Sequence, residues 1–121
     1  MFSPSPGMNR PPPGHQAHLD AMMREHLKLL GELVNARRNE LKMSQAEAAA
    51  WAGLSRTEMY QIEHGLTDEK ITTVFRVCRA LRMSVVEVVA RLDYLMNHPE
   101  DRPPNRGLKS QRGKNTRRSG H

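Results

Sequence analysis

Three polar side chains that lie close together in the sequence have the chemistry to pair with the edges of bases. Arg56, Thr57 and Gln61 occur in the segment SRTEMYQ, which begins at position 55. A guanidinium fork can donate two hydrogen bonds to guanine, an amide can pair with adenine, and a threonine can contact a thymine methyl group or a phosphate. This chemistry requires a helix that presents all three side chains on its outer face.

Residue types that support catalysis or metal binding lack the necessary spacing. The six histidines are scattered, and His15-x-x-His18 lies in a proline-rich stretch, so the sequence offers no zinc set. Cys78, the single cysteine, falls on an apolar helical stripe where a small buried residue is expected. No glycine-rich phosphate loop or nucleophile elbow occurs. The sequence therefore predicts a protein that is not an enzyme and uses no cofactor or metal.

Two short helices are predicted to position the polar side chains. Ser44-x-x-Glu47 and Ser55-x-x-Glu58 are capping boxes, in which the serine accepts a hydrogen bond from the backbone and the glutamate bonds the serine amide in return. Gly53, between them, suits the left-handed residue that ends a helix. Helices joined by so tight a turn must cross steeply. Residues 44–65 are therefore predicted to form a helix-turn-helix.

Apolar residues at helical spacing predict three further helices and no strand. These helices cover about residues 20–41, 71–81 and 85–98. Asp20 caps the first of them, a third capping box at Ser84-x-x-Glu87 opens the last, and Pro99 ends it. The predicted fold class is all-α, with five helices.

Charge divides the chain into three parts. All 13 Asp and Glu lie in residues 19–101 with 11 of the 19 Lys and Arg, so this part has a net charge of −2, although the whole chain has +6. We expect residues 19–98 to be the helical domain. Residues 1–18, rich in proline, and the basic residues 99–121 lack an apolar period and are predicted to be disordered. The basic tail either grips phosphates or only solubilises the chain.

The sequence gives no sign of secretion or of a membrane partner. No apolar run is long enough to span a bilayer. Prolines occupy the start of the chain, where a signal peptide would need an apolar core, and a single cysteine cannot form an internal disulfide. We therefore expect a cytoplasmic protein.

An ordered set of residues over positions 30–92 resembles the Cro and phage-repressor type of helix-turn-helix family, also called the xenobiotic-response-element (XRE) family. The set comprises Leu30-Gly31, Arg38, Ser44-Gln45, Ala49, Gly53-Leu54-Ser55, Ile62-Glu63-x-Gly65 and Ala80-Leu81-x-Met83-Ser84. The resemblance implies a five-helix lambda-repressor-like domain that binds duplex DNA. Asp68 and Glu69 depart from the family pattern, because relatives usually offer phosphate contacts there, and Arg82 replaces the usual helix-ending glycine.

The resemblance also assigns roles to individual residues. Arg56, Thr57 and Gln61 occupy the base-reading positions, and Arg38 with Glu63 resembles the family's partly buried salt bridge. The implied phosphate contacts are Ser44, Gln45, Ser55, Tyr60 and Lys70. Tyr60 is otherwise an ordinary amphipathic surface residue, and Glu58 is assigned to its helix cap rather than to a cytosine amine.

We interpret the chain as a transcriptional regulator, more specifically a repressor, that binds a duplex operator as a homodimer. Two alternatives remain. One is the antitoxin of a toxin-antitoxin pair, and the other is a protein-interaction module that does not read DNA, suggested by Asp68, Glu69 and the negative domain charge.

The expected dimer interface is the apolar stripe that extends beyond the family's usual end, formed by Leu92, Leu95 and Met96. Met22 and Met23, in the extension of the first helix, could assist or replace it. Trp51 is expected to cover the first helix or a partner subunit, because an exposed tryptophan without a contact is uncommon.

Overall fold

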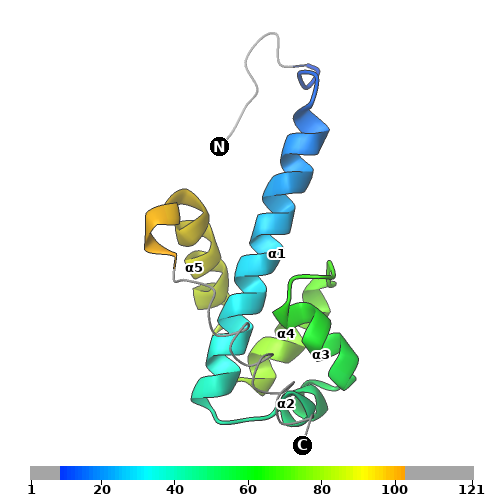
Figure 1. Ribbon diagram of the computed structural model, residues 1–121, viewed down its shortest axis with the longest axis vertical. Helices are drawn as coiled ribbons and strands as arrows, with labels where there is room; N and C mark the ends of the chain where they lie inside the picture. The colour runs from blue at the N-terminus through cyan, green and yellow to red at the C-terminus, as the bar shows by residue number, and fades with distance from the viewer. Residues whose placement is uncertain (1–8, 103–121) are drawn as a thin grey trace, which may run out of the picture.

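The structure is a computed structural model that describes residues 9–102, and its regular elements there are all helical (Figure 1). The elements in chain order are α1 (His15–Glu40), α2 (Gln45–Ala52), α3 (Arg56–Glu63), α4 (Ile71–Ala80), α5 (Val85–Asn97) and the short 3-10 helix η1 (Pro99–Asp101). The predicted all-α fold with five α-helices is confirmed. Residues 1–8 and 103–121, most of the two arms predicted to be disordered, lie outside the described residues.

The first helix begins earlier than predicted. α1 starts at His15 rather than near Asp20, so residues 15–18 are helical and do not belong to a disordered arm. Gly14 turns the chain with a left-handed φ of 81° immediately before the helix, and the His15 amide donates to the Pro12 carbonyl oxygen at 3.1 Å. After this turn no proline interrupts the sequence, so the helix extends back to the glycine.

The C-terminal boundary of the domain is also displaced. Pro99 ends α5 as predicted, but residues 99–101 form η1, and Arg102 then folds back onto the helices. The Nε atom of Arg102 donates to the Leu95 carbonyl oxygen at 3.0 Å, and its Nη1 atom pairs with the Glu25 carboxylate of α1 at 2.8 Å. Arg102 therefore belongs to the folded domain and not to the basic tail.

The second half of α1 carries the rest of the domain. α1 packs on α3 and α5, α2 packs on α3 and α4, and the first half of α1 projects beyond the other helices (Figure 1). The main core cluster consists of Val34, Ala48, Ala49, Ala52, Met59, Ile62, Val77 and Leu81. The alanines of α2 allow its neighbours to approach closely, while each larger apolar side chain stabilises the fold by about 1.5–3 kcal/mol.

α1 and α3 are in close backbone contact at Gly31. A Cβ atom at this position would lie 2.3 Å from the Glu63 carbonyl oxygen and 2.6 Å from that of Ile62. The α3 backbone leaves no room for a side chain at this position, so only glycine fits. This close approach sets the C-terminal end of α3 against α1.

The turns that follow α1 and α4 share one conformation. Each consists of a leucine, a basic residue, a methionine and a helix-capping serine, as Leu41-Lys42-Met43-Ser44 and Leu81-Arg82-Met83-Ser84. The basic residues have left-handed φ angles of 58° and 55°, and each methionine amide donates to the carbonyl five residues earlier, as in a Schellman motif. Arg82 therefore occupies the helix-ending position despite its side chain, which strains the backbone there.

The third predicted capping box is only half formed. The Ser84 hydroxyl accepts a hydrogen bond from the Glu87 amide at 3.3 Å, but within the described residues Glu87 makes no return bond to the serine amide. The ψ angle of Ser84 is 126°, compared with 165° at Ser44 and 160° at Ser55, so its backbone differs from that of the two complete boxes.

The strained turn after α4 yields the first prediction. Arg82→Gly should raise the free energy of unfolding by up to about 1 kcal/mol, because relief of the left-handed strain exceeds the added entropy of the unfolded chain. Urea denaturation followed by circular dichroism measures the change. Arg82→Ala is the matched control, since it removes the same charge but keeps the Cβ atom. An equal gain in both variants would locate the effect in the charge and contradict the prediction.

Candidate nucleic-acid interface

The turn between α2 and α3 is defined by hydrogen bonds at both helix starts. Ser44 and Ser55 accept from the Glu47 and Glu58 amides at 3.0 and 3.1 Å, and both glutamates accept from the serine amides at 2.8 Å. Gly53 has a φ of 71° and ends α2 as predicted. The carboxylate of Glu58 is therefore engaged in its cap, which agrees with the assignment of this residue to the helix start.

α3 has a buried side and a polar exposed side. Met59 and Ile62 are buried in the core, as their spacing predicted. On the opposite side the exposed residues are Arg56, Thr57, Glu58, Tyr60 and Gln61. The three predicted base-reading residues therefore lie together on the solvent side of one short helix. Their contact with bases stays a prediction.

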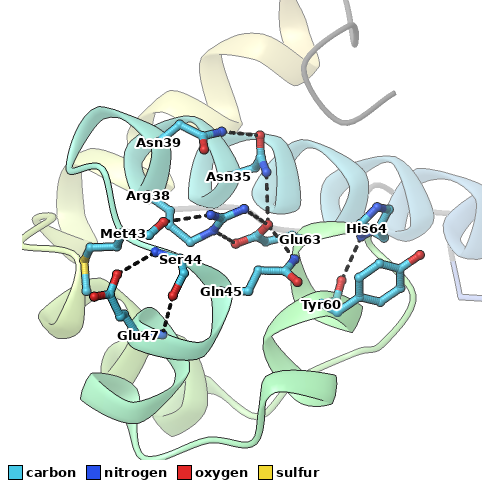
Figure 2. Close-up of polar contacts among 10 residues, drawn as sticks. All are labelled: Asn35, Arg38, Asn39, Met43, Ser44, Gln45, Glu47, Tyr60, Glu63 and His64. Carbon is cyan, nitrogen blue, oxygen red and sulfur yellow. Dashed lines mark hydrogen bonds and ion pairs between the residues drawn. The ribbon is translucent and has the colours of Figure 1, made fainter. Parts of the chain in front are cut away.

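A buried carboxylate joins α1, α2 and α3 (Figure 2). Glu63, at the end of α3, has a side chain that is 0% exposed, and its Oε2 atom accepts from Arg38 Nε at 2.6 Å. Its Oε1 atom accepts from Arg38 Nη2 at 2.9 Å, from Asn35 at 3.0 Å and from Gln45 at 3.1 Å. Arg38 also donates to the Met43 carbonyl oxygen at 2.8 Å. The expected Arg38–Glu63 pair is thus present, at the centre of a larger network.

The network fixes the orientation of Gln45, the first residue of α2. An ionised carboxylate can only accept hydrogen bonds, so the Gln45 amide must turn its nitrogen toward Glu63. The backbone amides of the first helical turn have no partner within the helix and carry a partial positive charge. Gln45 is therefore held at a helix end that can receive an anion.

The other residues predicted to contact phosphate are exposed on or next to α2, α3 and α4. Ser44 and Ser55 are exposed, but their hydroxyls serve the caps. The Tyr60 ring stacks on His64 with a centroid separation of 4.0 Å. Lys70 is exposed at the start of α4, without a capping bond from its side chain. Only Ser44 and Gln45 are neighbours, and no phosphate contact is tested by the structure.

Two asparagines of α1 were missed in the sequence analysis. Asn35 donates to Glu63, and Asn39 donates to the Asn35 side-chain oxygen at 3.1 Å. One sequence signal could have identified Asn35. It lies next to Val34 and three residues before Arg38, on a helical side where an apolar residue would be expected. A polar residue at a buried helical position requires a partner, and the sequence does not show which one.

The predicted dimer surface needs a correction. Leu95 is only 1% exposed and lies on α5, which packs on α1, so its side chain offers no surface to a partner. Leu92 and Met96 are half-buried. The large apolar residues that α5 does expose are Val86, at 77%, Val89, at 52%, and Tyr94, at 41%.

The expected contact of Trp51 with α1 is also wrong. Trp51 is 75% exposed, and it borders a groove with residues of α4, including Phe75. α2 packs on α3 and α4 and has no comparable contact with α1, so a residue on its outer side cannot reach the first helix.

The described residues show neither a metal set nor a membrane span. Among residues 9–102, no group of three or more His, Cys, Asp or Glu side chains could hold a metal ion. No helix in this part of the chain is both long enough and apolar enough to cross a bilayer. Burial raises the pKa of the Cys78 thiol above its ordinary value, which favours the unreactive protonated form.

Two capped helices joined by a glycine turn, with the second helix exposed on its polar side, define the helix-turn-helix class. The family model described as "Helix-turn-helix domain" matches residues 29–92, more than half of the chain. The protein therefore belongs to this helix-turn-helix family, in agreement with its resemblance to XRE-type domains. No curated protein matches the sequence.

Solved structures show the same fold. One is a point mutant of the restriction-modification controller protein C.Esp1396I, which is 22% identical, with a TM-score of 0.55 over 60% of this chain and 92% of the other. Another is the clp gene regulator ClgR from C. glutamicum, which is 23% identical, with a TM-score of 0.53 over 61% of this chain and 92% of the other. At these identities the likeness concerns the fold alone.

The buried network yields the second prediction. Arg38→Ala or Glu63→Ala should lower the free energy of unfolding by about 3–5 kcal/mol, because each change leaves an uncompensated buried charge. Lys28→Ala is the control: its pair with Glu25 is exposed, at 3.7 Å, and should contribute less than about 1 kcal/mol. Urea denaturation measures all three variants. Losses in the first two no larger than that of Lys28→Ala would show that the buried pair does not hold the helices together.

Proposed function

We propose that this protein is a transcriptional regulator that binds a specific sequence of duplex DNA. The observation that carries the proposal is the outer side of α3, where Arg56, Thr57 and Gln61 are exposed together while the inner side is locked into the core. An α-helix fits the major groove of B-DNA, and arginine and glutamine can each form two hydrogen bonds with one base. α3 is thus the recognition helix.

The start of α2 supplies the complementary contact with the DNA backbone. Gln45 is oriented by Glu63, and the free amides of the first turn favour a phosphate. Because Arg38 neutralises Glu63, the buried carboxylate does not repel that phosphate. Lys70 and Tyr60 provide further contacts at the other edge of α3 in this proposal.

The names of the structural neighbours agree with regulation. One neighbour is a controller protein of restriction-modification, and the other is a regulator of clp genes. We propose that this chain acts in the same class and, more narrowly, as a repressor in the cytoplasm. A helix of eight residues covers only a few base pairs, which favours two copies on a two-fold symmetric operator.

We propose α5 as the surface that joins the two copies. Within residues 9–102, the strongest contacts of α5 are with α1 and η1, and apolar residues on its outer side are exposed. Val86 and Val89 lie three residues apart on that side, and Met23 is exposed on the projecting half of α1. A two-fold contact through such a patch buries the same apolar residues on both copies.

Residues 103–121 are the basic segment that we propose adds to DNA binding. This segment contains six Lys and Arg and no acidic residue. Its charge would add a sequence-independent attraction to DNA that weakens with salt, whereas the helices, with their negative balance, would supply the specificity.

The third prediction tests base recognition. Arg56→Ala or Gln61→Ala should weaken binding to the operator by about 1–3 kcal/mol and leave binding to scrambled duplex nearly unchanged, since base contacts carry sequence information. Gel shifts with the DNA upstream of the protein's own gene, and with a scrambled duplex, measure both affinities. Thr72→Ala, an exposed change on α4, is the control. If wild-type protein binds both duplexes equally, the proposed function fails; equal losses on both duplexes reject base reading alone.

The fourth prediction tests the α5 surface. Val89→Glu should produce monomers with unchanged helical content, because the charge would be buried only at the contact between copies. Thr72→Glu adds the same charge to α4 and should leave the dimer intact. Sedimentation velocity at micromolar protein measures the assembly. A dimer that persists in Val89→Glu would exclude this surface as the interface.

A further inference from the structure

Trp51 and Phe75 flank a groove that plays no part in the proposed contact with DNA. The groove has a volume of about 450 Å³ and lies between the C-terminal end of α2 and α4. Its other lining residues are three small residues at the end of α2 and two arginines of α4: Ala50, Ala52, Gly53, Arg76 and Arg79. Trp51 is 75% exposed and Phe75 is 47% exposed.

α4 carries a further exposed apolar residue, Ile71, about one helical turn before Phe75. Ile71, Phe75 and Arg79 are spaced four residues apart on α4 and therefore share one face of that helix. Ile71 is itself 59% exposed. Exposed apolar surface next to arginine is the composition found at the centre of protein interfaces, where tryptophan and arginine contribute most of the binding energy.

The charge at the groove is positive and uncompensated. Neither Arg76 nor Arg79 takes part in an ion pair among the described residues, and no acidic side chain lines the groove. The one hydrogen bond of Arg76 is a long one, 3.5 Å, to the Gly53 carbonyl oxygen. A ligand that fits must therefore combine an apolar anchor with negative charge.

We propose that this groove binds an acidic segment of a partner protein. An apolar side chain of the partner inserts between Trp51 and Phe75, and its carboxylates pair with Arg76 and Arg79. This function is separate from DNA recognition, and it does not depend on it.

Other occupants fit the groove less well. A two-fold contact through this groove would bring together the arginines of two copies without an acidic lining residue from either, which is repulsive. The groove borders the glycine turn that leads into α3, but none of the residues proposed to contact DNA lines it. The groove also has only two arginines among its lining residues and no run of cations that would follow a nucleic-acid backbone.

Trp51 is the single tryptophan of the chain, so its fluorescence reports directly on the groove. The probe is a synthetic helical peptide of about 15 residues that carries Glu on one side and Leu on the other. A matched peptide replaces every Glu by Lys. We expect the acidic peptide to shift the Trp51 emission to the blue in a saturable manner, because the indole leaves water, and the basic peptide to leave it unchanged.

Charge reversal makes the test specific. R79E should weaken binding of the acidic peptide at least about tenfold and should confer binding of the basic one. R24E, on the exposed surface of α1, is the control and should change neither. Circular dichroism verifies that both variants remain helical.

Each contrary outcome overturns the proposal. No saturable shift with the acidic peptide up to about 1 mM, or equal binding of both peptides, would reject an acidic partner. A blue shift caused by operator duplex alone would assign the groove to DNA. A shift that follows protein concentration, without peptide, would assign it to a second copy.

Discussion

The buried carboxylate of Glu63 is the contact on which the arrangement of the motif depends. It accepts hydrogen bonds from α1, through Asn35 and Arg38, and from the start of α2, through Gln45. Such a group is stable inside the domain only when all of these donors are in place, because an unpaired buried charge is costly. The network therefore specifies one relative position of the three helices. Apolar packing alone would tolerate small displacements of α2.

The close approach at Gly31 makes this network possible. α3 lies so near to α1 that no Cβ atom fits between the Glu63 carbonyl and the first helix. At this separation the Glu63 side chain reaches Arg38 without exposing either group to water. The backbone contact and the ion pair thus support each other, and together they fix the angle at which α3 presents its outer side.

The helix-turn-helix motif could be predicted from local sequence rules. The burial of individual residues and their long-range partners depend on tertiary contacts and could not. The boxes at Ser44 and Ser55 and the turn at Gly53 depend on residues within one helical turn, so their outcome was predictable. Leu95 was misplaced because a helical stripe shows which residues are apolar but not which neighbour covers them. The role of Asn35 depends on a residue 28 positions away, and Arg102 is held by Glu25, 77 positions away. Such contacts have no sequence period.

The uncovered surfaces of the domain follow from its size and connectivity. α2 packs on α3 and α4, and α5 packs on α1, so the outer side of α5 and the face shared by α2 and α4 are left without a covering helix (Figure 1). The first carries valines and the second carries Trp51 and Phe75 with arginines, so the two surfaces differ in chemistry. The domain therefore presents a polar face on α3, an apolar face on α5 and a cationic aromatic face on α2 and α4, and the chemistry of each suits a different kind of partner. The Glu63 network fixes the position of α3, and α1 supports α5. One small domain can therefore present both surfaces.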